Sequence, residues 1–291
     1  MNVAHEVGEL RRQPRAVAIG TFDGVHLGHR RVLESAVAAG LTSTVVTFDP
    51  HPRIAFGYKV ELLTPLRRRL ELIEEAAVDD ALVVEFDLEL ARLEPEEFVE
   101  QVLRPIGTEV VVAGADFRFG RGRAGDLGLL GRLGFDARTV PLVENVSSSR
   151  IRDLLRGGKI EQAATLLGRA PEVEGTVVTG DARGGTLGFP TANLRLEPEL
   201  LVPAYGIYAG AADGHRAAIS IGTNPHYGGE ERRVEAHLLD FEGDLYGKRL
   251  VLQLWRRLRD EQSFGSEEEL VAQIAQDVEE TRAAEPPFRP G

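Results

Sequence analysis

The chain of 291 residues is 43% hydrophobic, so it can bury the cores of two domains of ordinary size. Acidic residues outnumber basic ones by 46 to 34, and the net charge of −12 argues against a protein that holds nucleic acid through its phosphates. The lack of cysteine excludes disulfides and thiolate sites, and no segment reads as a secretory signal or approaches the roughly 18 apolar residues of a membrane span. We therefore expect a cytoplasmic protein with small anionic ligands, no nucleic acid and no membrane.

The first half of the sequence alternates short apolar strands with amphipathic helices. The pattern predicts strands at 16–20, 43–48, 81–86 and 110–113. It predicts helices at 30–39, 65–77 and 95–103. Because the strands are almost entirely apolar, both faces of their sheet must be covered, which indicates a parallel α/β fold with ligands at the carboxyl ends of the strands.

Beyond a helical join with paired glycines at 147–169, strands follow one another without intervening helices. They are expected at 175–179, 208–212, 217–221, 233–239 and 250–255. Glycine turns between short strands favour a small β-barrel. A helix from Glu267 closes the chain, with Ser266 and Glu269 as a capping box. Its apolar stripe is expected to dock on the barrel and consists of Leu270, Val271, Ile274 and Val278.

A glycine- and histidine-rich turn follows the first predicted strand. It places Gly24, His26, Gly28 and His29 where a helix begins. Glycines let the backbone approach an anion, helix amides point at it, and two imidazoles can donate hydrogen bonds to oxygens that gain charge. Isolated histidines would be read as surface or capping residues, but this combination favours a phosphate site that needs no covalent intermediate.

A second cluster of polar residues, VSSSRIR at 146–152, marks another helix start. Its serines could simply cap the helix, but with two arginines they can also clamp a polyphosphate. The segment 114–125 contains a literal G-x-G-x-x-G from Gly120 to Gly125. Because this stretch does not join a strand directly to its helix, we reject a dinucleotide fingerprint and expect a loop over a nucleotide or aromatic ligand.

The second half carries a glycine-rich loop at 180–193 that lacks the Walker A spacing. The Thr191 hydroxyl and the Asn193 carbonyl are hard oxygen donors suited to Mg²⁺, although a plain hairpin loop before a proline turn explains the segment equally well. Glu235 stands among apolar residues in a predicted strand. Exposure is the common explanation, but phosphoryl transfer to a hydroxyl benefits from such a carboxylate as base.

These motifs together resemble the prokaryotic bifunctional riboflavin kinase and FAD synthetase family over nearly the whole chain. The resemblance is carried by GTFDGVHLGH, VTFDPHPR, GADFRFGRGRAGD, SSSRIR, RGGTLGFPTAN, GTNPHYGG, VEAHLLDFEGDLYG and RLRDEQSFGSEEEL. It implies a Rossmann-like nucleotidyltransferase domain at 1–169 that transfers AMP from ATP to FMN. It further implies a six-stranded antiparallel barrel with a terminal helix at 170–291 that makes FMN from riboflavin and ATP.

The resemblance also implies roles for individual residues. Catalysis falls to Glu235, His26 and His29. Nucleotide binding falls to Gly20, Phe22, Gly24, Gly28, Ser148, Ser149, Arg152, Gly180, Arg183, Gly188, Thr191 and Asn193. Flavin binding falls to Asp116, Phe117 and Arg259, and Mg²⁺ binding to Thr191 and Asn193. The implied partners are ATP, riboflavin and FMN, and the protein is expected to be a monomer or weak homo-oligomer.

Two other interpretations stay open. The first keeps the adenylyltransferase but changes its acceptor, for example to a pantetheine or nicotinate nucleotide, because the histidine turn is shared by that wider group. The second makes the C-terminal domain a flavin-binding sensor without catalysis. The presence of both Glu235 and Thr191 argues against the sensor.

Overall fold

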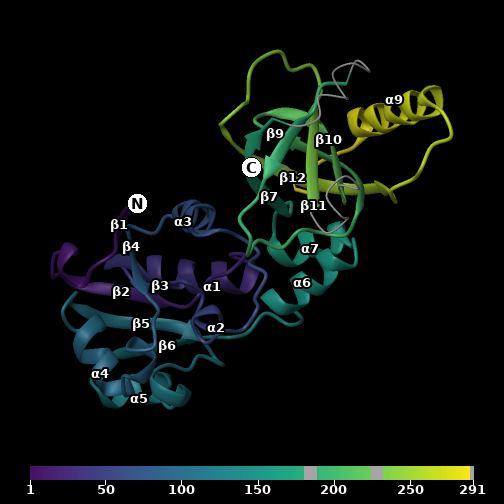
Figure 1. The fold of residues 1–291 in the computed structure, drawn as a ribbon. Coiled ribbons are helices and arrows are strands. Elements are labelled where there is room, and N and C mark those ends of the chain that lie inside the picture. The colour runs from purple at the N-terminus through teal and green to yellow at the C-terminus, as the bar shows by residue number, and fades with distance from the viewer. Residues whose placement is uncertain (180–188, 224–231, 289–291) are drawn as a thin grey trace. The chain divides into compact units, whose positions relative to one another are not determined.

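The computed structural model describes residues 1–179, 189–223 and 232–288 (Figure 1). The chain divides into two compact units, each of which is described by itself. The first comprises Met1–Val60 and Leu66–Ser147, and the second comprises Glu61–Pro65 and the chain from Ser148 onward. Among the described residues, no helix combines the length and apolar character needed to cross a membrane.

The first unit is a six-stranded parallel sheet covered by helices, as expected for a Rossmann-like fold. Its strand order is β1-β4-β3-β2-β5-β6. The elements in chain order are β1 (Asn2–Ala4), η1 (Val7–Glu9), β2 (Arg15–Ile19), α1 (Leu27–Val37), β3 (Thr42–Asp49), α2 (Pro52–Ala55), α3 (Leu66–Glu74), β4 (Asp80–Glu85), η2 (Leu90–Arg92), α4 (Pro95–Phe98), η3 (Val99–Leu103), β5 (Thr108–Gly114), η4 (Arg121–Arg123), α5 (Leu127–Arg132) and β6 (Asp136–Val140).

Strand β2 shows how this sheet separates two cores. Side chains alternate along a strand, so Ala16 and Ala18 join the hydrophobic cluster on one face, whereas Val17 and Ile19 join the cluster on the other. All four are buried. The four strands predicted in this half are confirmed, while the predicted helix 95–103 is α4 followed by a π-helical turn, η3.

The second unit is a closed antiparallel barrel with flanking helices. Its strand order is β10-β11-β8-β7-β12-β9, which confirms the six-stranded barrel with a terminal helix. The elements are α6 (Ser148–Arg156), α7 (Ile160–Leu167), β7 (Glu172–Val178), β8 (Ala192–Arg195), β9 (Gly206–Ala212), β10 (His215–Thr223), β11 (Arg232–Leu238), β12 (Arg249–Arg259) and α9 (Glu267–Ala283).

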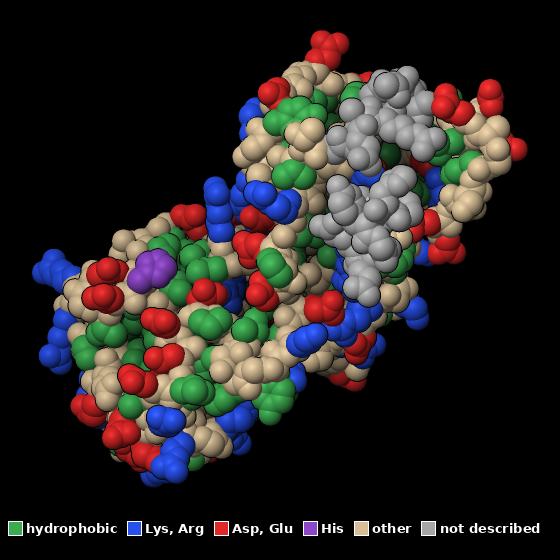
Figure 2. Space-filling view, in the orientation of Figure 1, with side chains coloured by type: hydrophobic (Ala, Val, Ile, Leu, Met, Phe, Trp, Pro, Cys, Tyr) green, Lys and Arg blue, Asp and Glu red, His purple; other side chains and the backbone are tan. Residues whose placement is uncertain are grey.

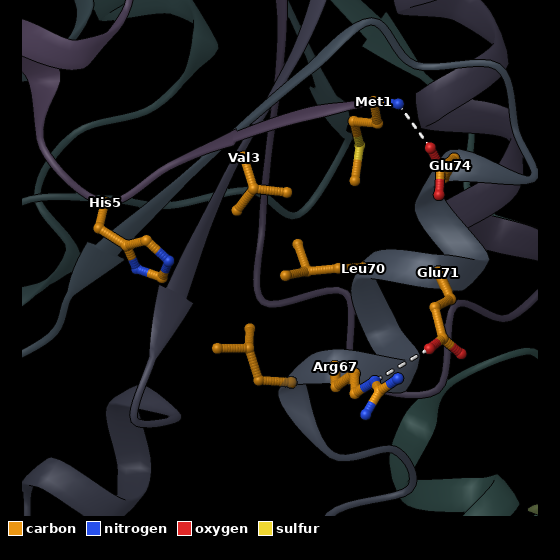
Figure 3. Close-up of a pocket in the computed structure, with 8 residues that line it drawn as sticks. Met1, Val3, His5, Arg67, Leu70, Glu71 and Glu74 are labelled. Carbon is orange, nitrogen blue, oxygen red and sulfur yellow. Dashed lines mark hydrogen bonds and ion pairs between the residues drawn. The ribbon is translucent and has the colours of Figure 1, made fainter.

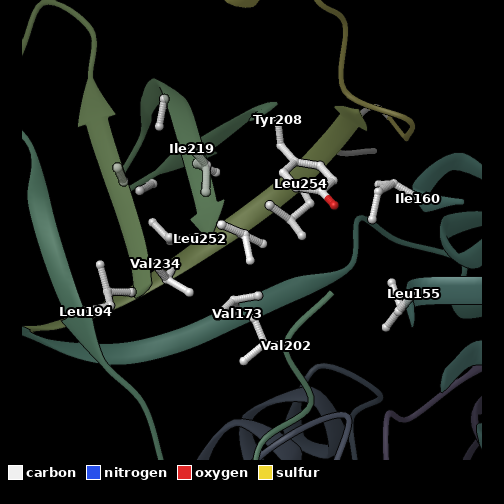
Figure 4. Close-up of a cluster of buried hydrophobic side chains, with 14 of the residues drawn as sticks. Leu155, Ile160, Val173, Leu194, Val202, Tyr208, Ile219, Val234, Leu252 and Leu254 are labelled. Carbon is white, nitrogen blue, oxygen red and sulfur yellow. The ribbon is translucent and has the colours of Figure 1, made fainter. Parts of the chain in front are cut away.

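The barrel core draws on both strands and helices (Figure 4). Val173, Ile219 and Leu252 point into the interior, and Leu155 and Ile160 bring α6 and α7 into the same cluster. The join 147–169 is thus two helices, separated at the predicted glycine pair. These helices pack in the second compact unit, while the functional boundary at 169/170 stays a prediction.

Helix α9 contacts β9 and β10. Ser266 caps it by accepting a hydrogen bond from the Glu269 amide, but the Glu269 carboxylate accepts from the Gly265 amide instead of from Ser266, so only half of the predicted capping box forms. Of the predicted apolar stripe, Val278 is buried and the other three residues are half-buried. A buried ion pair described below also ties this helix to the barrel.

Candidate active sites

The turn that follows β2 has an unusual backbone conformation, with three residues at positive φ angles. Phe22, Gly24 and Val25 adopt positive φ angles of 51°, 82° and 36°, and such a value is strained for a β-branched residue. The side chains of Phe22 and Val25 are buried and anchor the turn. The Val25 amide donates to the Phe22 carbonyl at 3.0 Å. Strain retained this way indicates a turn whose shape serves a function.

The two predicted catalytic histidines meet at this turn. His26 caps α1, and its Nδ1 accepts a hydrogen bond from the His29 amide at 3.2 Å. The ring N–H of neutral His26 therefore lies on Nε2, which can donate to a ligand. The two rings stack with centroids 3.6 Å apart. Gly28 permits this arrangement, because a Cβ there would lie 3.2 Å from the His26 ring.

The histidine turn lies at the reversal point of the strand order. From β2 the chain continues to β3 on one side, whereas β5 neighbours β2 on the other side. Parallel sheets bind ligands at the carboxyl ends of strands at such a point. Asp116 and Phe117 follow β5 at this same edge, with Asp116 exposed and Phe117 half-buried. The structure thus brings these two residues to the sheet edge that carries the histidines.

Sequence reasoning missed a buried cation beneath the turn. The Arg69 side chain is 3% exposed and donates to the Thr21 carbonyl at 2.9 Å and the Phe48 carbonyl at 3.2 Å. Burial lowers the pKa of Arg69, and the charges of Asp23 and Asp49 oppose that shift. Arg69 therefore joins the ends of β2 and β3. The sequence carried one signal of its burial: Arg69 lies three and four residues before Leu72 and Ile73, so all three share the buried face of α3.

A row of phenylalanine rings was also missed. Centroids of neighbouring rings lie 5.6 to 6.4 Å apart. The row runs in the order Phe56, Phe86, Phe48, Phe98, Phe119 and Phe117. At one end Phe56 is 54% exposed, which is high for so large an apolar side chain. The row therefore runs from this exposed ring, which follows the carboxyl end of β3, to the buried rings of Phe98 and Phe119.

Two glycines of the 114–125 loop serve packing. Gly120 has φ +70°, and a Cβ on it would lie 2.8 Å from the backbone of Pro95. A Cβ on Gly125 would lie 2.7 Å from the ring of Phe119, with which Gly125 forms an isolated β-bridge. Both glycines are thus explained without a bound dinucleotide.

The predicted polyphosphate clamp begins helix α6. Ser148 is half-buried and Ser149 is exposed in its first turn. Arg152 donates from Nε to the Glu61 carbonyl at 2.7 Å. These residues belong to the second compact unit and the histidine turn to the first, so their convergence on one triphosphate stays a prediction.

In the second unit, one of the two predicted metal ligands and the predicted base lie on adjacent strands. Asn193 of β8 pairs in register with Glu235 of β11. Both side chains are half-buried on the outer face, because the alternating residues Leu194 and Val234 fill the barrel core. His237 Nδ1 lies 2.8 Å from the Pro190 carbonyl, one residue before Thr191. Gly180, Arg183 and Gly188 lie outside the described residues.

Arg259, predicted to bind flavin, is engaged within the protein. Its Nε and Nη2 donate to the two carboxylate oxygens of Asp277 in α9 at 2.9 and 2.7 Å. Its guanidinium also lies 5.9 Å from the ring centroid of Phe264. The described contacts give Arg259 a structural role, and its flavin role stays a prediction.

Comparison with known proteins covers both units. The FAD synthetase family model matches residues 9–152, and the riboflavin kinase family model matches residues 167–284. The bifunctional riboflavin kinase/FMN adenylyltransferase of Listeria monocytogenes serovar 1/2a is 35% identical over 288 residues, or 92% of each chain. The protein of the same name from Escherichia coli K12 is 36% identical over 293 residues, or 94% of this chain and 93% of that one.

The chain belongs to the bifunctional riboflavin kinase/FMN adenylyltransferase family.

A solved structure has the same fold over almost the full length. It is titled as a macrolide-efflux protein from Streptococcus pneumoniae, is 31% identical, and superposes with a TM-score of 0.85 over 96% of this chain and 98% of that one. A shared fold does not transfer the activity in that title. The family assignment rests on the two matched domains and the relatives that carry both names.

Magnesium fits the residues of the kinase half. Within the described ranges, no group of three or more His, Asp or Glu side chains could hold a metal ion alone. Thr191, Asn193 and Glu235 instead offer a hydroxyl, an amide and a carboxylate oxygen. Mg²⁺ commonly binds through few protein oxygens together with water and nucleotide phosphates. A donor set of hard oxygens that is incomplete without phosphate suits a kinase of this family.

A cavity of about 390 Å³ lies elsewhere on the first unit (Figure 3). It is lined by β1 and α3, with Met1, Val3 and Leu70 on its apolar side and Glu71 and Glu74 at its rim. Strands β4 and β3 separate β1 from β2 in the sheet, and the lining includes none of the predicted site residues. The cavity is therefore distinct from the histidine turn.

Charged side chains of both signs are interspersed over the face shown in Figure 2. Several arginines have carboxylate partners; Arg68, for example, lies 3.2 Å from both Glu71 and Glu75. Basic clusters in the sequence are thus partly neutralised by nearby acids in the fold.

Proposed function

We propose that this chain carries out both activities of its family. In the first reaction, riboflavin and ATP give FMN and ADP, and in the second, FMN and a further ATP give FAD and pyrophosphate. The carrying observation is that the two matched family models lie in tandem and that each covers a recognisable fold with its own cluster of polar residues. Relatives named for both activities along their length disfavour another acceptor or a non-catalytic sensor.

In the adenylyltransferase half, we assign transition-state stabilisation to the histidine turn. An FMN phosphate oxygen attacks the α-phosphorus of ATP, the bond to the bridging oxygen breaks, and pyrophosphate leaves. His26 can donate from Nε2 while its Nδ1 stays bound to the α1 backbone. His29 is stacked on it and supplies the second imidazole. Donors fixed in place where charge develops lower the barrier without reorganising.

The exposed end of the phenylalanine row is a candidate platform for the flavin of FMN. Aromatic rings favour offset-stacked and edge-to-face contacts with other rings. Phe56 is exposed, contacts Phe86 edge to face, and follows the carboxyl end of β3. This edge is also the one from which the histidine turn emerges, so the flavin and the reacting phosphates would bind on one side of the sheet.

In the kinase half, we assign the base to Glu235. The riboflavin 5′-hydroxyl loses its proton to the Glu235 carboxylate as its oxygen bonds to the γ-phosphorus, and ADP leaves. Asn193 lies opposite Glu235 in the β8–β11 ladder, and Thr191 precedes Asn193 by two residues. These two would hold Mg²⁺, which supplies charge neutralisation at the phosphates.

A crossover of two variants tests the assignment. Glu235→Gln should lower FMN formation from riboflavin about 100-fold or more, because it removes the proton acceptor, and should leave FMN conversion to FAD unchanged. His29→Ala should lower FAD formation by a similar factor and leave FMN formation intact. Both are measured by separating flavins after incubation of the pure protein with ATP, Mg²⁺ and riboflavin or FMN.

Circular dichroism of each variant serves as the folding control. If either substitution abolished both steps equally in folded protein, the assignment of one reaction to each half would be wrong.

A further inference from the structure

One arginine lies between the two key residues of the kinase half. Arg233 and Glu235 are two residues apart on β11, so their side chains project from the same face of the strand, the outer face of the barrel. Arg233 Nε donates to Asn193 Oδ1 at 3.1 Å, and its Nη2 lies 2.5 Å from Glu235 Oε1. The guanidinium thus bridges the amide and the carboxylate across the β8–β11 ladder.

This bridge is partly shielded from water. The side chains of Arg233 and Glu235 are 30% and 21% exposed, respectively. Contacts that involve an ionised partner are stronger than neutral ones, and shielding increases their weight over that of a fully exposed pair. The remaining exposure gives the flexible Arg233 side chain a route toward solvent.

The contacts of Arg233 conflict with those proposed for the metal. Asn193 Oδ1 is the oxygen assigned to Mg²⁺, yet here it accepts from a guanidinium. A cation of charge +1 and another of charge +2 repel each other strongly at the separation that sharing one oxygen would impose. Glu235 contributes a single negative charge, which cannot compensate both cations.

We propose that Arg233 is a resting-state lock that stands in for the divalent cation and must leave Asn193 before Mg²⁺ binds. This inference rests on the proposed kinase function. Arg233 is thus a positioning residue: it holds the Asn193 amide and the Glu235 carboxylate together on the outer face of the barrel. It also sets the Mg²⁺ concentration at which the kinase half becomes active.

Calorimetric titration of the full chain with ADP, with and without Mg²⁺, tests the lock. The quantity compared is the factor by which Mg²⁺ increases ADP affinity. Arg233→Met should raise this factor roughly three- to tenfold, because one partly exposed, charge-assisted contact no longer competes. Arg233→Lys keeps the charge but loses the two-pronged contact, so it should lie between the wild type and Arg233→Met.

Asn193→Ala identifies the contribution of the kinase half. This substitution should reduce the factor, and adding Arg233→Met to it should have no further effect, because the contested oxygen is gone. Arg232→Met is the matched control on the same strand; Arg232 lies 3.5 Å from Glu61, and its substitution should leave the factor unchanged. In turnover, Arg233→Met should lower the apparent KM for Mg²⁺ in FMN formation more than it changes kcat, with FAD formation unaffected.

Two failures are distinguishable. If Asn193→Ala leaves the factor unchanged, the proposed metal ligand is wrong, and the lock falls with it. If Asn193→Ala reduces the factor but Arg233→Met leaves it unchanged or lowers it, the lock alone is refuted, and Arg233 then braces the barrel or binds the nucleotide.

Discussion

Substitution of Asp277 by Asn should weaken the attachment of α9 to the barrel. Asp277 is 6% exposed, accepts two hydrogen bonds from Arg259, and accepts a third from Gln273 at 3.1 Å. Removing one partner of a buried ion pair costs about 3–5 kcal/mol, because the other charge stays buried. Arg259 is 16% exposed and also donates to the Asp260 carbonyl, so we expect the lower part of that range, about 3 kcal/mol.

The chain contains a built-in reporter for this measurement. Trp255 is the only tryptophan, lies on β12, and is 8% exposed. Its fluorescence during urea denaturation therefore follows the barrel and not the parallel sheet. At the usual slope of about 1–3 kcal/mol per molar urea, a loss of about 3 kcal/mol lowers the midpoint by roughly 1–3 M.

Matched variants sharpen the result. Glu280→Gln on the exposed side of α9 keeps the side-chain hydrogen bond with Gln276 possible and should leave the midpoint unchanged. The double variant Arg259→Met with Asp277→Leu should be more stable than Asp277→Asn, because no charge stays buried alone. If Asp277→Asn shifted the unfolding free energy by less than about 0.5 kcal/mol, the pair would not be what holds the helix.

Two further outcomes are expected. Gly28→Ala should lower FAD formation at least about tenfold without affecting FMN formation, because the added Cβ meets the His26 ring at 3.2 Å and must displace it. An unchanged rate of FAD formation in a flavin-separation assay would show that the position of the ring is not critical. Burial raises the pKa of Glu261, and the charge of Arg259 opposes this shift. The folded state therefore keeps the Glu261 proton to higher pH than the unfolded state does. Stability from this group is lost as the pH rises through the pKa of the folded state. Glu261→Gln should therefore stabilise the barrel at about pH 8 and not at about pH 4 in Trp255 fluorescence; equal stability at both would contradict it.

The central strands of both units could be predicted because their hydrophobic patterns are strong. Strand β6 escaped prediction, since as an edge strand it exposes most of its residues and its sequence, DARTV, reads as polar. Strand β1 has only three residues and pairs with β4 far along the chain. Strand β8 directly follows the Pro-Thr turn, where the sequence signalled a loop.

The site was predictable where neighbouring residues carry it and unpredictable where the fold assembles it. The histidine turn lies within one strand-to-helix connection, so local sequence revealed it. Arg69 is one of three consecutive arginines, and only the fold shows that it is the buried one. The bridge from Arg233 to Asn193 joins residues 40 positions apart, and it required the register of β8 against β11.

The segment Glu61–Pro65 belongs to the second unit, which matters for attempts to express the two halves separately. Leu62 forms a parallel bridge with Leu200, and Leu63 belongs to the barrel's hydrophobic cluster. A kinase half expressed alone from residue 170 would therefore lack a pentapeptide that completes its packing, along with α6 and α7. Supplying the missing segment in trans, or grafting it onto a shortened kinase, would be the route to a self-sufficient monofunctional fragment.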